Sequence, residues 1–183
     1  VAVPPPILGM IPEVPELEYP TMRLIAAELT GSKGGAAQFI TPDHPAEHPN
    51  QFVRGLKVRS LEVGFEAYIE DGDLFVVGIN ANEAIRALLR ANDVLVRAGK
   101  HGLTGLILSC SGTGGLENET LDAINASGLP ALALPQDSAE IVRHVANLSI
   151  KIQPYDLAKK QLIDQTYKEY LDLAELTERF GCR

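Results

Sequence analysis

The sequence predicts an α/β fold in which a single layered domain has a mostly parallel sheet flanked by helices. Three apolar runs, Leu74–Ile79, Leu103–Ser109 and Leu129–Pro135, alternate with two stretches of helical pattern. Each run is almost continuously apolar, which is typical of strands that helices cover on both faces. A helix between successive strands makes the strands parallel and the crossovers right-handed.

The residues before this core divide into an arm, a helix and a linker. Six prolines among residues 1–20 exclude a regular helix and leave an extended apolar segment, Ile7–Ile11, that can add an edge strand. Thr21 is placed to cap a short amphipathic helix that ends at Gly31. Residues 32–50 contain a Gly-Gly pair and three prolines, which indicates a linker.

The core begins with residues 52–63, which predict strand structure with a bend or bulge at Gly55. After the first apolar run, Asn80 and Glu83 have the spacing of a capping box, so we expect Asn80 to be the N-cap of the next helix. Gly99 supplies the stop of that helix.

Three more helices follow. We expect one at Gly115–Ser127, and one that Asp137 caps with Glu140 at the third position. Asp156 is placed to cap a last helix of more than twenty residues, which is long for a globular domain. We therefore expect this long C-terminal helix to leave the domain and contact a partner subunit or a following domain.

Composition and charge exclude several classes of function. The 183 residues are 45% hydrophobic and carry a formal net charge of −8, with 16 lysines and arginines that form no cluster. Nucleic acids and anionic membranes need a basic surface, so neither is an expected partner. No apolar run approaches the roughly 20 residues of a membrane-spanning helix. Two cysteines in different settings, without a secretory signal, favour the cytoplasm, or an organelle stroma or matrix after removal of a transit peptide.

The carboxyl ends of parallel strands are the usual place for a ligand. The sequence SCSGTGG follows the second apolar run, and a glycine-rich turn before a helix exposes backbone N–H groups that suit a small anion. An alternative interpretation is a tight turn that needs glycine only for its backbone conformation. The candidate ligand-binding residues are Asn80, Asn82, Ser109, Ser111, Thr113, Gly114 and Gly115.

No catalytic or metal-binding set is apparent in the sequence. The spacing of a P-loop and its lysine are missing from the glycine-rich turn, and no histidine is placed to activate Cys110. His44 and His48 have the spacing of a helical metal pair, but three nearby prolines prevent the helix and no third ligand is evident. We expect no cofactor, no metal and no catalysis by this chain alone.

Residues from about 50 to 175 resemble the DRTGG domain. That module lies between a dethiobiotin synthetase-like P-loop domain and the catalytic domain of long bacterial phosphate acetyltransferases. The family's aspartate-arginine pair is replaced here by Asn80-Ala81-Asn82, whereas Thr113-Gly114-Gly115 retains its TGG element. The segments that carry the resemblance are LFVVGINANEAIRALLRA, GLTGLILSCSGTGG, GLPALALPQDSAEIVRHV and SIKIQPYDLAKKQLIDQTYKEYLDL.

The resemblance implies a domain organisation. The segment ILGMIPEVPELEYPTMRLIAAEL is similar to the closing strand and helix of the dethiobiotin synthetase-like domain. The expected parts are this remnant at residues 1–31, the linker at 32–50, a DRTGG-like α/β domain at 51–153 and the C-terminal helix at 154–183.

Three functions remain open at this point. The resemblance favours a non-catalytic regulatory or assembly module that forms a homo-oligomer and senses a small anionic metabolite in acetyl-CoA or acetyl phosphate metabolism. The second is a fragment of a phosphate acetyltransferase-like or dethiobiotin synthetase-like enzyme, with a neighbouring enzyme domain as its partner. The third is a scaffold whose proline-rich arm and terminal helix bind another protein.

Overall fold

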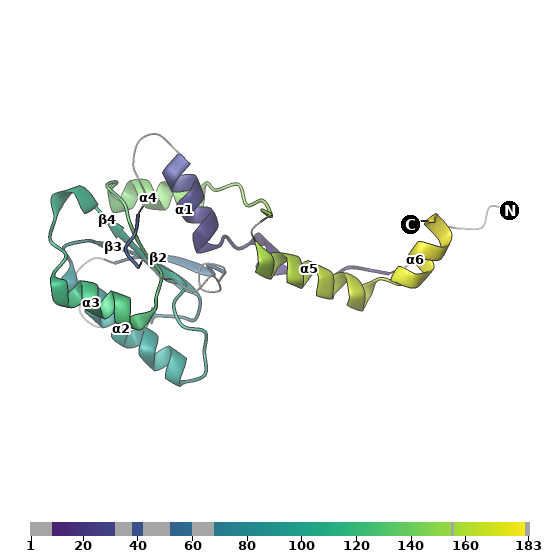
Figure 1. Cartoon of the computed structure of the whole chain (residues 1–183), viewed down its shortest axis with the longest axis horizontal. Helices are drawn as coiled ribbons and strands as arrows, with labels where there is room; N and C mark the ends of the chain where they lie inside the picture. The colour runs from purple at the N-terminus through teal and green to yellow at the C-terminus, as the bar shows by residue number, and fades with distance from the viewer. Residues whose placement is uncertain (1–8, 32–37, 42–51, 60–67, 155, 182–183) are drawn as a thin grey trace. The chain divides into compact units, whose positions relative to one another are not determined.

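The computed structural model of the chain describes residues 9–31, 38–41, 52–59, 68–154 and 156–181. The chain divides into two compact units (Figure 1). The larger unit comprises residues 19–150, and the smaller unit combines residues 1–18 with residues 151–183. Among the described residues, no helix is both long and apolar enough to cross a membrane.

The described strands of the larger unit form one sheet in the order β1-β5-β4-β3-β2. β2, β3, β4 and β5 are mutually parallel, and β1 pairs with β5 in the antiparallel sense. This arrangement confirms the predicted mostly parallel α/β fold. The strands are β1 (Gln38–Phe39), β2 (Gly55–Arg59), β3 (Asp73–Gly78), β4 (Gly105–Ser109) and β5 (Ala131–Ala133).

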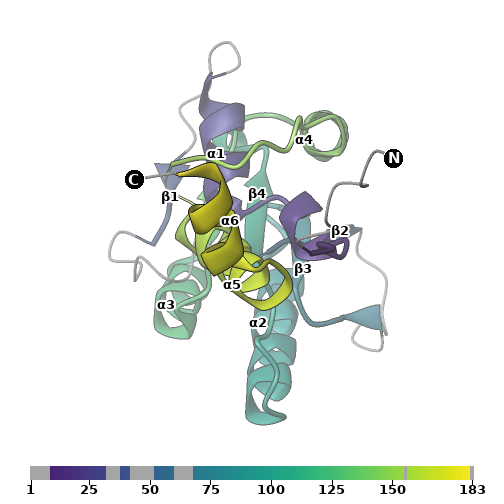
Figure 2. The same ribbon diagram turned by 90° about the vertical axis from the view of Figure 1, so that its right-hand side faces the viewer.

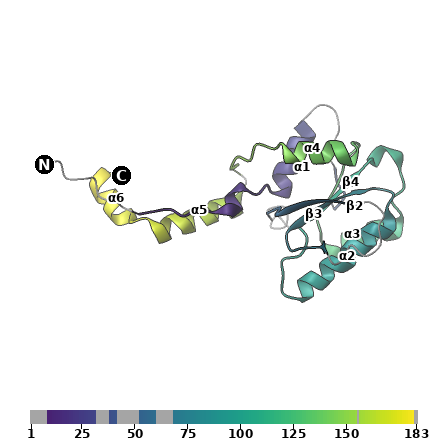
Figure 3. The same cartoon turned by 180° about the vertical axis from the view of Figure 1, so that it is seen from behind.

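Helices cover both faces of this sheet. The helices are α1 (Met22–Gly31), α2 (Asn82–Arg97), α3 (Asn118–Ser127) and α4 (Ser138–Ala146). In Figure 2, α1 and α4 lie above the sheet and α2 and α3 lie below it. α2 and α3 run side by side (Figure 3).

The alternation of side chains along each strand explains the two apolar cores. In β3, Phe75 and Val77 pack with α2 and α3, whereas Leu74 and Val76 pack with α1 and α4. All four side chains are buried, as are the residues of β4. Strands covered on both faces need apolar residues at every position, which is why these runs are visible in the sequence.

Several helix ends agree with the sequence. Thr21 Oγ1 accepts a hydrogen bond from Leu24 N at 3.2 Å, and Asp137 Oδ1 accepts one from Glu140 N at 2.8 Å. Gly99 has φ +79° directly after the end of α2. These contacts confirm two predicted N-caps and one predicted stop.

Two predicted helix starts are wrong. α2 begins at Asn82 with Ala81 in the N-cap position, so Asn80 is not the N-cap. α3 begins at Asn118, three residues after the predicted start at Gly115. Gly115 has φ +110°, outside the helical region, so α3 starts after it. The side chain of Asn82, the first residue of α2, bonds to the loop before α3.

The segment between α1 and β2 contains a strand that the sequence did not predict. β1 has only two residues, and it pairs with Leu132 and Ala133. A strand of two residues is too short to show the alternation of apolar and polar residues by which a strand is recognised in a sequence. The predicted Ile7–Ile11 edge strand falls partly on residues outside the described ranges, and Gly9 makes an isolated bridge to Leu171. His44, His48 and the end of the predicted 52–63 strand also lie outside the described residues.

The smaller unit contains the C-terminal helix in two pieces. Its described elements are a 3-10 turn (Pro15–Glu18), α5 (Leu157–Tyr170) and α6 (Leu173–Phe180). A single helix of more than twenty residues was predicted, but Leu171 is extended, with φ −118° and ψ 136°. Asp172 then caps α6 by accepting a hydrogen bond from Glu175 N at 2.9 Å. The Asp172-x-x-Glu175 spacing is therefore a helix start inside an otherwise helical pattern.

Lys159 ties α5 to the N-terminal arm within the smaller unit. Its side chain is buried, and Nζ donates a hydrogen bond to the carbonyl oxygen of Leu17 at 2.8 Å. Burial lowers the pKa of Lys159, and the nearby carboxylate of Asp156 partly opposes that effect. The hydrogen bond from Lys159 to Leu17 therefore holds the N-terminal arm against α5.

A second lysine joins β2 to β3 in the larger unit. Lys57 Nζ lies 2.7 Å from Asp73 Oδ2 and 3.2 Å from Glu70 Oε2. The carboxylate of Asp73 is only 3% exposed and also accepts a hydrogen bond from Glu70 N. Partial burial lowers the pKa of Lys57, but the hydrogen bonds with Asp73 and Glu70 outweigh it and raise that pKa.

We expect Lys57→Met to lower the free energy of unfolding by about 1–3 kcal/mol, because it leaves the buried Asp73 carboxylate without its cation. Solvent screens the half-exposed lysine, so the loss stays below that of a fully buried pair. Because the folded-state pKa of Lys57 is raised, the difference from wild type stays constant from about pH 7 to 9 and shrinks above the ordinary lysine pKa of about 10.4. Urea titrations of the variant and of the wild type at several pH values measure this difference in the free energy of unfolding.

Lys151→Met is the matched control, since Lys151 is exposed and in the smaller unit. The role of the Lys57–Asp73 pair would be contradicted if Lys151→Met lost as much stability as Lys57→Met. It would also be contradicted if the difference between Lys57→Met and the wild type grew at high pH.

Candidate ligand-binding site at the strand ends

The carboxyl ends of β3, β4 and β5 lie along one edge of the sheet. The chain leaves β4 toward α3 on one face and leaves β5 toward α4 on the other face. In open α/β sheets, connections that diverge in this way mark the usual ligand crevice. The turn after β4, residues 110–115, lies at this position and is called the SGTGG turn below.

Two hydrogen bonds join the start of the SGTGG turn to the connection after β5, and a third joins the end of β4 to the start of α4. Cys110 N donates to the carbonyl oxygen of Gln136 at 2.8 Å, and Ser111 N donates to that of Leu134 at 2.9 Å. The hydroxyl groups of Ser109 and Ser138 are 2.8 Å apart. These contacts close the gap between the two connections, so a ligand has to lie outside the turn and not between the strands.

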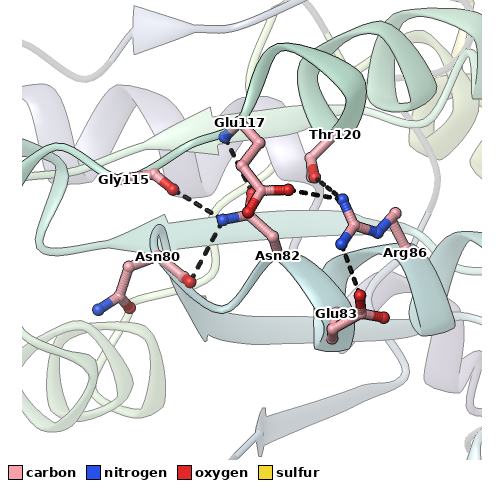
Figure 4. Close-up of polar contacts among 7 residues, drawn as sticks. All are labelled: Asn80, Asn82, Glu83, Arg86, Gly115, Glu117 and Thr120. Carbon is pink, nitrogen blue, oxygen red and sulfur yellow. Dashed lines mark hydrogen bonds and ion pairs between the residues drawn. The ribbon is translucent and has the colours of Figure 1, made fainter.

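Asn82 holds the other end of the turn. Its Nδ2 donates to the carbonyl oxygen of Gly115 at 2.7 Å, and its Oδ1 accepts from Glu117 N at 3.0 Å (Figure 4). A Cβ atom on Gly115 would lie 2.8 Å from Asn80 Cβ. The close approach and the positive φ both require glycine at position 115.

Arg86 adds a polar bridge between α2 and α3. Its guanidinium donates to Glu117 at 2.9 Å, to Thr120 Oγ1 at 2.8 Å and to Glu83 at 2.7 Å (Figure 4). Hydrogen bonds with Glu117 and Glu83 raise the pKa of Arg86, and the bond with Arg86 lowers the pKa of Glu83. Sequence reasoning missed Arg86. Two local signals are present: Arg86 follows Asn82 by four residues and Glu83 by three, so all three share one side of the helix.

The predicted site residues divide by role. Asn82 and Ser109 are buried and bonded to backbone or to another side chain, and the carbonyl of Gly115 is bound by Asn82. These three residues shape the turn. The predicted residues that remain to face a ligand are Ser111, Thr113, Gly114 and Asn80. Ser111 is half-buried, and the other three are exposed.

Open space lies above the middle of the turn. A Cβ atom added to Gly112 or to Gly114 would have no other atom within 4 Å. Thr113 Oγ1 donates back to the carbonyl oxygen of Cys110 at 2.8 Å, so its side chain lies along the turn. A rigid turn with bare backbone at two glycines allows a ligand to approach the main chain closely.

The side-chain chemistry of this edge is limited. Cys110 is half-buried in a left-handed conformation, with φ 58°. The side-chain oxygen of Gln136 is buried and has no described hydrogen-bond partner. Arg86, the cation near the turn, is already paired with two carboxylates. Within the described ranges, no group of three or more histidine, cysteine, aspartate or glutamate residues could hold a metal. The groups that this edge offers to a ligand are therefore backbone and neutral polar groups.

Known structures are similar to this fold, although neither a protein-family model nor a curated protein matches the sequence. One is the crystal structure of the CBS and DRTGG domains of the regulatory region of Clostridium perfringens pyrophosphatase, in complex with its activator diadenosine tetraphosphate. The TM-score is 0.50 and the identity is 16%, over 82% of this chain and 61% of that chain. The likeness is one of fold, and this chain spans about three fifths of that structure's length.

We expect Gly115→Ala to lower the free energy of unfolding by about 1–3 kcal/mol, because it adds a clash with Asn80 to a strained φ. Gly112→Ala is the matched control in the same turn. It adds the same methyl group where there is open space and no positive φ, and its effect should stay within about 0.5 kcal/mol. Denaturant unfolding of both variants gives the comparison. Equal losses would show that the turn is not held against Asn80.

Proposed function

We propose that this chain is a non-catalytic regulatory module of the DRTGG type that binds a small anionic ligand at the SGTGG turn. The observation that carries the proposal is the fixed position of this turn at the carboxyl edge of the sheet. Hydrogen bonds hold the turn at both ends, and its central glycines face open space. Such a turn binds without first having to be ordered, which saves conformational entropy.

The fold comparison supports the regulatory part. The similar pyrophosphatase region is regulatory and was solved with the activator diadenosine tetraphosphate. A nucleotide with a polyphosphate chain belongs to the class of small anions that a glycine-rich turn suits. We therefore place nucleotides first among the candidate ligands, ahead of the acyl-CoA and acyl phosphate compounds that the DRTGG resemblance implies.

The charge of the site shapes the expected affinity. Arg86 is paired with Glu83 and Glu117, and the Thr113 hydroxyl donates to Cys110, so a phosphate at the turn would meet backbone N–H groups of the glycines and the hydroxyl of Ser111. Backbone donors bind anions without a full counter-charge. We expect modest affinity that weakens little with salt, unlike sites built from lysine and arginine.

The proposal includes the wider context expected from the sequence. The DRTGG-like domain at residues 51–153 would act within a larger assembly, through self-association or a neighbouring enzyme domain, in the cytoplasm. A role in acetyl-CoA or acetyl phosphate metabolism is the finer part of this proposal. The TGG element supports this metabolic role. Among the described residues, no contact at the turn is specific for an acyl group.

We expect diadenosine tetraphosphate or a related nucleotide to raise the melting temperature of the chain, since a ligand specific to the native state stabilises it. The panel also contains ATP, acetyl-CoA, acetyl phosphate and inorganic phosphate. Gly112→Leu should abolish the shift without lowering the melting temperature of the free protein, because its side chain fills the open space above the turn. Ala146→Leu, on the exposed side of α4, is the control for an added leucine.

Each outcome of this panel is informative. No shift with any compound would remove the ligand from the proposal. A shift that survives Gly112→Leu would move the site away from the turn. Release of phosphate from acetyl phosphate by the chain would contradict the non-catalytic assignment and favour the enzyme fragment.

A further inference from the structure

A chain of three hydrogen bonds connects Arg86 to the SGTGG turn. Arg86 Nη1 donates to Glu117 Oε2 at 2.9 Å, and the backbone N–H of Glu117 donates to Asn82 Oδ1 at 3.0 Å. Asn82 Nδ2 then donates to the carbonyl oxygen of Gly115 at 2.7 Å (Figure 4). Gly115 is the last residue of the turn, so Glu117 is the residue through which Arg86 reaches this end of it.

Thr120 fixes the guanidinium group at the start of this chain. Its hydroxyl oxygen accepts a hydrogen bond from Arg86 Nη1 at 2.8 Å, and Thr120 is fully buried in the first turn of α3. The two carboxylates that pair with Arg86 are more exposed, since the side chain of Glu117 is 56% exposed and that of Glu83 is 82% exposed. Solvent weakens such ion pairs. The buried hydroxyl therefore sets the position of the guanidinium group, and the carboxylate of Glu117 follows it.

The shape of the arginine side chain suits a position whose acceptors belong to two helices. Nη2 donates to Glu83 on α2, whereas Nη1 donates to Glu117 and Thr120 at the beginning of α3. A guanidinium group presents several N–H groups in fixed directions, and the ammonium group of a lysine has only one nitrogen. Arg86 therefore joins the beginning of α2 to the beginning of α3 at the end of the turn that Asn82 holds.

The opposite end of the turn depends on different contacts. Cys110 N and Ser111 N donate to carbonyl oxygens of the connection after β5. The two glycines in the middle of the turn face open space. The position of this bare backbone is therefore set from both ends, and the contacts of Arg86 act on one of them.

We infer that Arg86 is a positioning residue for the ligand: it holds Glu117, which holds the SGTGG turn through Asn82. This inference rests on the ligand binding proposed above and names a residue outside the turn that sets the affinity. Without Arg86, the Gly115 end of the turn is held less firmly, so a ligand has to order it on binding. That ordering costs conformational entropy and lowers the affinity.

A simple effect of charge predicts a different result, which makes the inference testable. Glu117→Met removes a negative charge close to the turn, and by electrostatics alone it tightens the binding of an anion. If Glu117 links Arg86 to Asn82, the same substitution weakens binding. Glu119→Met is the matched control, because Glu119 is also an exposed acidic residue at the beginning of α3 and makes no hydrogen bond or ion pair with Arg86.

The first readout is affinity, with diadenosine tetraphosphate as the probe in calorimetric titrations of the full chain. Arg86→Met and Glu117→Met should each weaken binding by at least about fivefold, because the turn is less preorganised. The variant with both substitutions should lose no more than the weaker-binding single variant, since both act on one link. Glu119→Met should bind as well as the wild type or better. Glu117 is exposed, so its substitution tests the link even if Arg86→Met does not fold.

The second readout is amide hydrogen exchange, which needs no ligand. In Arg86→Met the amide of Glu117 should exchange at least about tenfold faster than in the wild type, because local opening at the start of α3 becomes easier. The amide of Cys110, which donates to Gln136 at the opposite end of the turn, is the reference and should keep its rate.

The outcomes separate this inference from the proposed function. Tighter binding by Glu117→Met, or losses that add in the double variant, would show that Arg86 does not act through Glu117 and would leave the ligand proposal standing. A wild type that binds no compound of the panel described above would overturn the proposed function. The positioning role would then be judged by amide exchange alone, and an unchanged rate at Glu117 in Arg86→Met would overturn it.

Discussion

Hydrogen bonding at both ends of the SGTGG turn determines the form of the carboxyl edge of the sheet. Cys110 and Ser111 bond to the connection after β5, and Asn82 bonds to the end of the turn and to the loop before α3. The order of β3, β4 and β5 brings these groups together from distant positions, which are 23 residues apart for Ser111 and Leu134 and 33 residues apart for Asn82 and Gly115. The turn has little freedom left, so its central glycines hold a fixed surface toward solvent. The candidate site is this surface.

The sequence predicted the parts of the fold that burial dictates. β3 and β4 are covered on both faces, so the pattern requires apolar residues at each position and the two runs stand out. The caps at Thr21 and Asp137 are local, because each side chain bonds to a backbone N–H three residues later. β1 could not be predicted, since two residues paired with a distant strand leave no periodic signal.

The sequence predicted where the candidate residues lie and only some of the contacts they make, and ligand binding by them stays a prediction. Strand ends and glycines indicated where to look, and the residues chosen there do lie at the carboxyl edge of the sheet. The role of Asn82 depends on Gly115 and Glu117, which no local pattern relates to it. The same long-range contacts explain the error at Asn80, whose spacing to Glu83 fits a capping box that the folded chain does not form. Arg86 was missed because two of its three contacts, with Glu117 and Thr120, become visible only when α2 and α3 are adjacent.

α2 joins the SGTGG turn to the apolar core on one face of the sheet. Its first turn holds the SGTGG turn through Asn82, and its second half carries Arg90, Val94 and Arg97. A helix of 16 residues is about 24 Å long, and Asn82 at its start is bonded to the SGTGG turn, so a change in the position of the turn would act first on α2. If a ligand at the turn favours one position of α2, any equilibrium that depends on that position changes by the same free energy by which it in turn changes ligand binding. The helix thus provides a physical basis for the regulatory role that is proposed for this chain.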